Sequence, residues 1–183
     1  LVANKKSSAN GEIYVCKNKH EERKIIKICK KITSKAYLRF KHEIENIVSS
    51  QDLYCVVPII DYRLPPDPFN ENKRDTPYYV MNEGIEIIKY LSPKTLLKKI
   101  EFITVLANTL YELHLRNIFH RDIKPTNIIV IDKFPYLIDF GISKSSDSID
   151  ITGNNAIGPK YTMAPEVKTA SKEERKSLDW SKA

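Results

Sequence analysis

The segment His120-Arg121-Asp122-Ile123-Lys124-Pro125-Thr126-Asn127 brings a carboxylate, an ammonium group and a side-chain amide close together in the sequence. Asp139-Phe140-Gly141 begins twelve residues after Asn127, and Ala164-Pro165-Glu166 comes further on. Taken alone, each segment is typical of a surface loop or of a turn after a strand. Their joint occurrence, in this order and at this spacing, indicates one functional site rather than three unrelated loops.

These three segments resemble the protein kinase signature H-R-D-x-x-x-x-N, D-F-G and A-P-E. The resemblance implies transfer of the γ-phosphoryl group of ATP to a hydroxyl of a protein substrate. Catalysis of this kind depends mainly on positioning and on neutralising charge. In the family pattern Asp122 orients or deprotonates the acceptor hydroxyl, and Lys124 neutralises the moving phosphoryl group. A lysine at this position accompanies Ser/Thr specificity in the family, so we expect a Ser or Thr acceptor.

The metal ligands that the resemblance implies are Asn127 and Asp139, which offer the oxygen atoms that Mg²⁺ prefers. Apolar runs at 128–131 and 136–138 lie on either side of a polar turn that contains Asp132-Lys133. This pattern predicts a β-hairpin. The hairpin would hold Asn127 at the start of one strand and Asp139 at the end of the next, so the two ligands would lie close together.

A lysine that faces ATP is expected in the strand-like run 24–28. Lys27 matches the lysine of the family's V-A-I-K motif, so the resemblance implies that it contacts the α- and β-phosphates. Ile25 stands where the family has Ala beside the adenine ring. The bulkier side chain is expected to narrow the adenine pocket.

A helix over roughly residues 35–50 is predicted by apolar side chains at helical spacing. Glu43 in this helix matches the family's glutamate that pairs with the ATP-facing lysine. Glu45 is the alternative, because each residue along a helix turns the side chain by about a quarter of a turn. The position in the motif favours Glu43. The apolar residues that define the helix are Tyr37, Phe40, Ile44, Ile47 and Val48.

The nucleotide site implied by the resemblance departs from the family pattern in the loop that covers the phosphates. Gly11 is the last of three expected glycines, and Lys6 and Ser8 stand at the other two positions. Tyr78-Tyr79-Val80-Met81 resembles the strand that enters the hinge, which makes Met81 the gatekeeper. The backbone of the next three residues would bind adenine. The expected contacts of ATP are Gly11, Ile13, Ile25, Lys27, Met81, Asn82, Glu83, Gly84, Ile129 and Asp139.

Three further segments are interpreted against this pattern. Residues 63–77 predict a surface loop between two strands. The polar stretch 142–163 is expected to be an activation segment, in which phosphorylation would add charge that Arg121 pairs with. His120 is expected to be a packing residue of the core. A long helix before it is predicted from a packing stripe of Leu96, Leu97, Ile100, Ile103, Ala107, Leu110, Leu113 and His114.

The expected fold class is α+β with two lobes. Residues from about 1 to 81 would form an N-terminal lobe with an antiparallel sheet and one helix. Residues from about 82 to 183 would form the hinge and the first part of a mostly helical C-terminal lobe. The resemblance reaches only to about Glu166, so we expect a partial and incomplete kinase domain.

Composition narrows the class of partner. The chain carries a net charge of +7, but its basic clusters are scattered, which favours a solvated surface over a nucleic-acid site. Its three cysteines form no C-x-x-C motif, which suggests a reducing compartment. Since no run of about 18 apolar residues occurs, no membrane span is expected. We therefore expect an intracellular, cytoplasmic protein, with a nuclear location left open.

Two alternative functions remain open from the sequence. The glycine-poor phosphate loop, Ile25 and Pro159, which stands where the family usually has Thr, are compatible with a weak or inactive kinase-like scaffold or binding protein. The second alternative is a kinase that acts on small molecules. Lys124 and the Ala164-Pro165-Glu166 segment favour protein substrates over that alternative. The favoured function is a Ser/Thr protein kinase that uses ATP and Mg²⁺.

Overall fold

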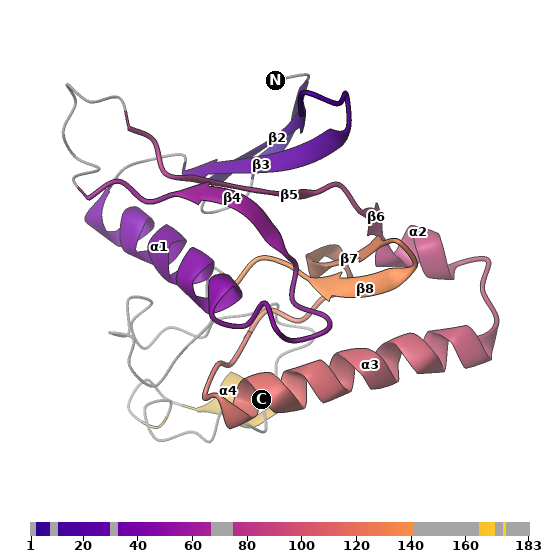
Figure 1. The fold of residues 1–183 in the computed structure, drawn as a ribbon. Coiled ribbons are helices and arrows are strands. Elements are labelled where there is room, and N and C mark those ends of the chain that lie inside the picture. Colours follow the sequence, from indigo (N-terminus) through magenta and orange to yellow (C-terminus); the bar gives the residue numbers. More distant parts are fainter. Residues whose placement is uncertain are drawn as a thin grey trace.

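The structure is a computed structural model that describes residues 3–7, 11–29, 33–66, 75–140, 165–170 and 174. An antiparallel sheet and helix α1 form one part of the molecule, and a small second sheet with helices α2 and α3 forms the other (Figure 1). This arrangement confirms the predicted α+β class. The boundary near residues 81 and 82 stays a prediction.

The larger sheet has the strand order β1-β2-β3-β5-β4, and every neighbouring pair is antiparallel. Side chains alternate between the two faces of a strand, and β3 shows this with Ile25, Lys27 and Cys29 all buried. Lys27 lies opposite Tyr79 and Ile25 lies opposite Met81 in the register of β3 and β5. The strands are β1 (Ala3–Ser7), β2 (Gly11–Lys17), β3 (Arg23–Cys29), β4 (Ile59–Arg63) and β5 (Tyr78–Asn82).

Helix α1 (Ser34–Val48) confirms the helix predicted over roughly 35–50. Its N-terminus is capped by the Thr33 side chain, which accepts a hydrogen bond from the backbone N–H of Ala36 at 3.2 Å. Phe40, Ile44 and Ile47 are buried on one face of the helix. A polar side chain of α1 that reaches the sheet must therefore lie on this same buried face.

The second sheet contains the hairpin predicted from the sequence. Strands β7 and β8 are antiparallel, and Asp132 and Lys133 turn the chain with positive φ angles of 49° and 71°, as a tight hairpin turn requires. The short strand β6 pairs with β7 on its other side. The elements here are β6 (Ile85–Glu86), α2 (Ile87–Leu91), α3 (Leu96–Leu115), the 3₁₀-helix η2 (Pro125–Asn127), β7 (Ile128–Ile131), β8 (Phe134–Leu137) and, beyond, α4 (Pro165–Thr169).

The segment after α1 ties the two parts together. The backbone N–H of Leu137 in β8 donates to the carbonyl of Cys55 at 2.6 Å, and the N–H of Val57 donates to the carbonyl of Leu137 at 3.2 Å. These residues are almost completely buried. At the end of α3, Arg116 pairs with Asp52 through two contacts of 2.7 and 2.5 Å. The C-terminal end of α1 is thereby held against both the hairpin and α3.

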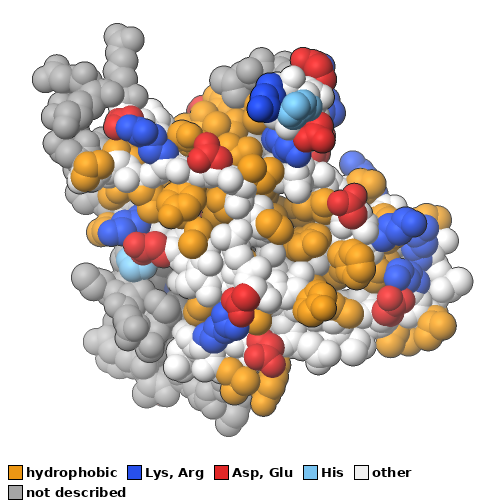
Figure 2. Space-filling model, viewed as in Figure 1, with side chains coloured by type: hydrophobic (Ala, Val, Ile, Leu, Met, Phe, Trp, Pro, Cys, Tyr) orange, Lys and Arg blue, Asp and Glu red, His pale blue; other side chains and the backbone are white. Residues whose placement is uncertain are grey.

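The packing stripe predicted for the long helix was wrong over its first part. Leu113 of that stripe is buried and Leu110 is partly buried, whereas Leu96, Leu97, Ile100 and Ile103 are exposed. The other buried residues of α3 are Phe102, Leu106 and Thr109. The helix is apolar on more than one side, and periodicity alone does not tell which side packs on the hairpin. Hydrophobic side chains gather on the surface over α2 and α3 (Figure 2). Across the described residues, no helix combines the length and apolar character needed to cross a membrane.

The two faces of α1 give a direct test of this packing. Ile47 is completely buried, whereas Leu38 on the same helix is 38% exposed. Ile47→Ala is expected to lower the free energy of unfolding by about 2–5 kcal/mol, because it removes buried methyl groups and leaves a cavity. Leu38→Ala should change it by about 0.5 kcal/mol or less. Urea denaturation measures both values, and equal losses would contradict the assigned orientation of α1.

Candidate active site

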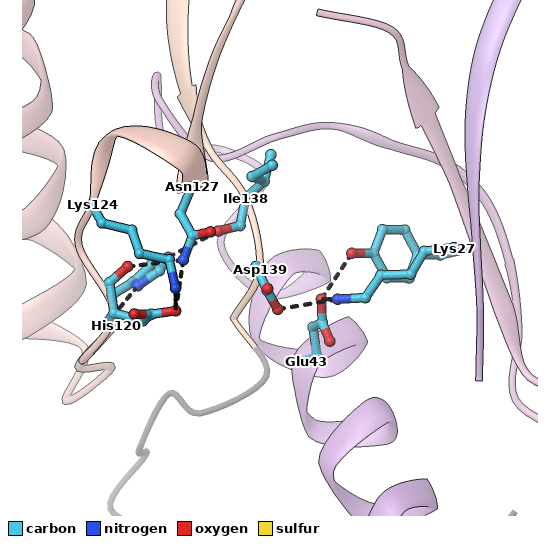
Figure 3. A network of polar contacts seen from close by, with 9 residues as sticks. Lys27, Glu43, His120, Lys124, Asn127, Ile138 and Asp139 are labelled. Carbon is cyan, nitrogen blue, oxygen red and sulfur yellow. Dashed lines mark hydrogen bonds and ion pairs between the residues drawn. The ribbon is translucent and has the colours of Figure 1, made fainter. Parts of the chain in front are cut away.

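A buried ion-pair cluster joins the sheet, helix α1 and the residue that follows β8. The Nζ atom of Lys27 lies 2.5 Å from Oε1 of Glu43 and 3.1 Å from Oδ1 of Asp139 (Figure 3). Lys27 is 2% exposed and Glu43 is completely buried. Glu45, the alternative partner, is an exposed residue. The structure therefore selects Glu43 as the partner of Lys27.

Burial and mutual attraction act in opposite directions within this cluster. Burial is the largest influence and raises the pKa of Glu43, although Lys27 opposes it. For Lys27 burial alone would lower the pKa, but the adjacent carboxylates hold the pKa well above its usual value. Burial would also raise the pKa of Asp139, yet the ammonium group of Lys27 keeps that pKa below its usual value. Lys27 is thus a cation held between carboxylates.

Asp122 is oriented by side chains from its own loop. The Nζ atom of Lys124 donates to Oδ2 of Asp122 at 2.7 Å. The Nδ2 atom of Asn127 donates to the same oxygen at 2.8 Å and to the backbone carbonyl of Asp122 at 2.9 Å. The 3₁₀-helix η2 closes the loop and brings Asn127 back toward Asp122. Since Nδ2 is used as the donor, Oδ1 is the atom with which Asn127 could bind a metal.

His120 connects the Asp122 loop to the end of β8. The backbone N–H of Asp122 donates to Nδ1 of His120 at 3.3 Å, and Nε2 lies 3.2 Å from the carbonyl oxygen of Ile138. Its ring packs against Phe140 with 4.6 Å between the centroids. Burial lowers the pKa of His120, which fits a neutral ring with its hydrogen on Nε2. The predicted packing role is confirmed, and the ring also joins two functional segments.

The backbone is left-handed at two positions in this site. Arg121 has φ 60° and Asp139 has φ 66°, a region that non-glycine residues adopt infrequently. Arg121 precedes Asp122, and Asp139 follows the carbonyl that binds His120. Backbone of this kind clusters at functional sites, where the surrounding contacts must hold it in place.

Two pairs of residues that are predicted to contact the nucleotide lie against each other in the structure. Met81 and Ile25 are buried and lie opposite each other on β5 and β3. Gly84 approaches Ile129 so closely that a Cβ at position 84 would lie 2.9 Å from the Ile129 side chain. This contact brings a predicted hinge residue against β7. The two residues before Gly84 have side chains that contact β3. The Asn82 side chain accepts a hydrogen bond from Lys24 at 2.8 Å, and Glu83 pairs with Arg23 at 2.6 Å.

Gly11 and Ile13 lie on β2 beside the buried lysine. Ile13 is opposite Lys27 in the register of β2 and β3. A Cβ at Gly11 would lie 2.8 Å from the backbone oxygen of Ile28 and 3.1 Å from Cγ of Lys27. Glycine is therefore required for the close approach of the two strands. Gly11 and Ile13 thus lie next to Lys27, while the roles of all these residues toward a nucleotide stay predictions.

The donor set around Asn127 and Asp139 fits Mg²⁺ bound together with a phosphate ligand. The two residues flank the strand pair in which Ile128 lies opposite Leu137, so the hairpin brings them together as predicted. Within the described residues, no group of three or more His, Cys, Asp or Glu side chains could hold a metal ion. Mg²⁺ is commonly held by one or two protein ligands together with substrate phosphates.

A family model described as "Protein kinase domain" matches residues 2–182. The chain belongs to this family. The domain is 34% identical to serine/threonine-protein kinase PknH of Mycobacterium bovis over 117 residues, which cover 61% of the chain and 18% of that protein. It is 27% identical to serine/threonine-protein kinase sgk-1 of Caenorhabditis elegans over 179 residues, covering 93% and 37%. It is 32% identical to dual specificity protein kinase zak2 of Dictyostelium discoideum over 189 aligned positions, covering 95% and 27%.

The kinase domain spans less than two thirds of the length of these curated relatives.

Some expectations concern parts outside the described residues. The proposed activation segment, Pro159 and Ser8 of the phosphate loop lie there. Arg121 is described, and its role as a receptor for phosphate stays a prediction.

One residue of the site was missed in the sequence. Tyr79 of the kinase domain is almost completely buried and donates a hydrogen bond from its hydroxyl to Oε1 of Glu43 at 2.8 Å. The sequence signal was a tyrosine within an otherwise apolar strand, which needs a partner for its hydroxyl when it is buried.

The lowered pKa of His120 predicts a pH-dependent stability. An unfolded histidine has a pKa of about 6.5, so the unfolded chain gains this proton at a higher pH than the folded chain. The stability contributed by neutral His120 is fully present above the unfolded pKa of about 6.5 and is lost as the pH falls from there through the lowered pKa of the folded state. The loss is at most about 1.4 kcal/mol per pH unit. His120→Gln should flatten the dependence of the unfolding free energy on pH below about pH 6.5.

The exposed His20 provides the matched control. His20→Gln makes the same substitution at an exposed position and controls for the change of side chain. If His120→Gln and the unsubstituted chain had the same slope, His120 would not be a buried neutral ring.

Proposed function

We propose that the chain is part of a Ser/Thr protein kinase that transfers the γ-phosphoryl group of ATP with the help of Mg²⁺. One observation carries this proposal: Lys27 lies between Glu43 and Asp139, at 2.5 and 3.1 Å. A cation held in this way is suited to the α- and β-phosphates of ATP. Glu43 would orient Lys27, and the adenine ring would contact the backbone of the hinge and the side chains of Ile25 and Ile129.

Asn127 and Asp139 would hold the metal. When bound, Mg²⁺ supplies positive charge that neutralises the phosphates. The contacts of Asn127 support this role, because its amide nitrogen is anchored on Asp122 and its oxygen remains for coordination. Asp139, whose Oδ1 atom is 3.1 Å from Nζ of Lys27, would be shared between that cation and the metal.

Asp122 would act on the acceptor hydroxyl. Its carboxylate would orient the hydroxyl and accept its proton while the oxygen bonds to the γ-phosphorus and the bond to ADP breaks. Lys124, whose Nζ atom is 2.7 Å from Oδ2 of Asp122, is near enough to neutralise the transferred group. The lysine supports a Ser or Thr acceptor, as do the names of two relatives. Because zak2 is named as dual specificity, the assay must offer tyrosine as well.

Arg121 supports a proposal about regulation. It directly precedes Asp122 in the catalytic loop and holds a left-handed backbone. A phosphate added within residues 142–163 would supply an anion that Arg121 can pair with.

Removing single carboxylates tests the proposed mechanism. Asp122→Asn is expected to lower the rate of transfer from γ-labelled ATP by about 10²- to 10⁴-fold, because the proton acceptor is lost. Asp139→Asn should abolish Mg²⁺-dependent transfer. The measurement uses the full-length protein with Ser, Thr and Tyr peptides.

The matched control is Asp132→Asn, which changes an exposed aspartate in the turn between β7 and β8. It should retain full activity. Equal activity of the Asp122 and Asp132 variants would contradict the proposal. Nucleotide binding without any transfer would instead support the scaffold alternative.

Ile25 provides a test of the adenine pocket. It is buried opposite Met81, where a smaller side chain would leave more room. Ile25→Ala is expected to tighten ATP binding severalfold if the isoleucine narrows the pocket, although the lost packing should also lower stability by about 2–5 kcal/mol. Ile26→Ala changes the next residue, on the other face of β3, and should leave affinity unchanged. Equilibrium titration with ATP measures both, and weaker binding by Ile25→Ala would contradict the prediction.

A further inference from the structure

A tyrosine hydroxyl that the proposed mechanism does not use lies against the Lys27–Glu43 pair. The hydroxyl of Tyr79 donates to Oε1 of Glu43 at 2.8 Å. The Nζ atom of Lys27 lies 5.7 Å from the centroid of the same ring. Tyr79 is 1% exposed, so water does not compete for this hydrogen bond. Two donors, Lys27 and Tyr79, therefore converge on one carboxylate oxygen.

The fold explains why these groups meet. Tyr79 lies opposite Lys27 in the register of β5 and β3, so their side chains point to the same face of the sheet. Helix α1 covers that face, and the ring of Tyr79 also packs against Phe40 of α1 with 5.7 Å between the centroids. Tyr79 thus contacts α1 twice, while Met81, two residues later on β5, leads into the predicted hinge.

We propose that Tyr79 is a positioning residue that holds Glu43 toward Lys27 and connects the strand before the hinge to helix α1. This inference rests on the proposed function, in which Lys27 binds the phosphates of ATP.

The need for a second donor follows from how Lys27 is shared. Its ammonium group already contacts Glu43 and Asp139 and would turn partly toward the phosphates when ATP binds. Glu43 is completely buried, and its Oε2 atom has no hydrogen-bond partner within the described part of the chain. A buried carboxylate with weakened pairing is destabilised. The hydroxyl of Tyr79 is a donor that stays on Glu43 while Lys27 engages the nucleotide.

The hydroxyl also affects the protonation of Glu43. Burial raises the pKa of Glu43, whereas the donors Lys27 and Tyr79 lower it and Asp139 raises it. These three residues are the charged and titratable groups that face Glu43: Lys27 comes from β3, Tyr79 from β5 and Asp139 from the segment just after β8. Without the hydroxyl, Glu43 would take up a proton at a higher pH than in the unsubstituted protein. The loss of the ion pair on acidification would then begin at a higher pH.

The test is Tyr79→Phe in the full-length protein, which removes only the hydroxyl and keeps the ring packing. We expect kcat/KM for ATP to fall about ten- to a hundredfold, as for a hydrogen bond to a charged group. The acidic limb of the pH profile should also move to higher pH. Tyr78→Phe is the matched control. Tyr78 is the residue next to Tyr79 on β5, and its hydroxyl donates to Asp61 of β4 at 3.0 Å rather than to Glu43.

A second measurement does not depend on activity. Titration of the Glu43 carboxyl carbon by ¹³C NMR should show a higher pKa in Tyr79→Phe than in the unsubstituted protein or in Tyr78→Phe. An unchanged Glu43 titration, or a loss of stability with an unchanged pH profile, would overturn the positioning role. Absence of transfer by the unsubstituted protein would contradict the proposed kinase function, while the titration would still decide the role of Tyr79.

Discussion

The buried ammonium group of Lys27 is the constraint on which the rest of the site depends. A cation that is 2% exposed must be paired, and its partners come from α1 and from the residue after β8. The pairing therefore requires that the sheet, the helix and the hairpin meet at one point. Phe40, Ile44 and Ile47 hold α1 on the sheet, and this apolar packing keeps Glu43 in reach of the lysine.

The second requirement is that the hairpin and the catalytic loop keep a fixed relation to that cluster. His120 provides this link, since its two ring nitrogens contact the backbone of Asp122 and of Ile138. Asp139 is the next residue after Ile138, so the loop that would handle the acceptor hydroxyl is tied to the ligand that would handle the metal. The segment 55–57, paired with β8, extends the same linkage to the end of α1.

Much of this arrangement could be predicted from motif residues. The hairpin, helix α1 and the choice of Glu43 over Glu45 were predicted, and the structure confirms all three. The first part of the stripe on α3 was wrong, because a helix that is apolar on several sides gives the same periodicity for each side. The buried side follows from what packs on it, and that is set by the position of the hairpin rather than by the helix itself.

The sequence by itself determined the family, the α+β class and the kinds of side chain in the site. It did so because the motifs place these side chains at fixed spacings along the chain. Only the tertiary structure decided which buried polar groups contact one another. Tyr79 lies 36 residues from Glu43 along the chain, and no local pattern joins them. Their contact arises because antiparallel register sets Tyr79 beside Lys27 and helix packing sets Glu43 above both, so the energies of these buried groups depend on long-range geometry.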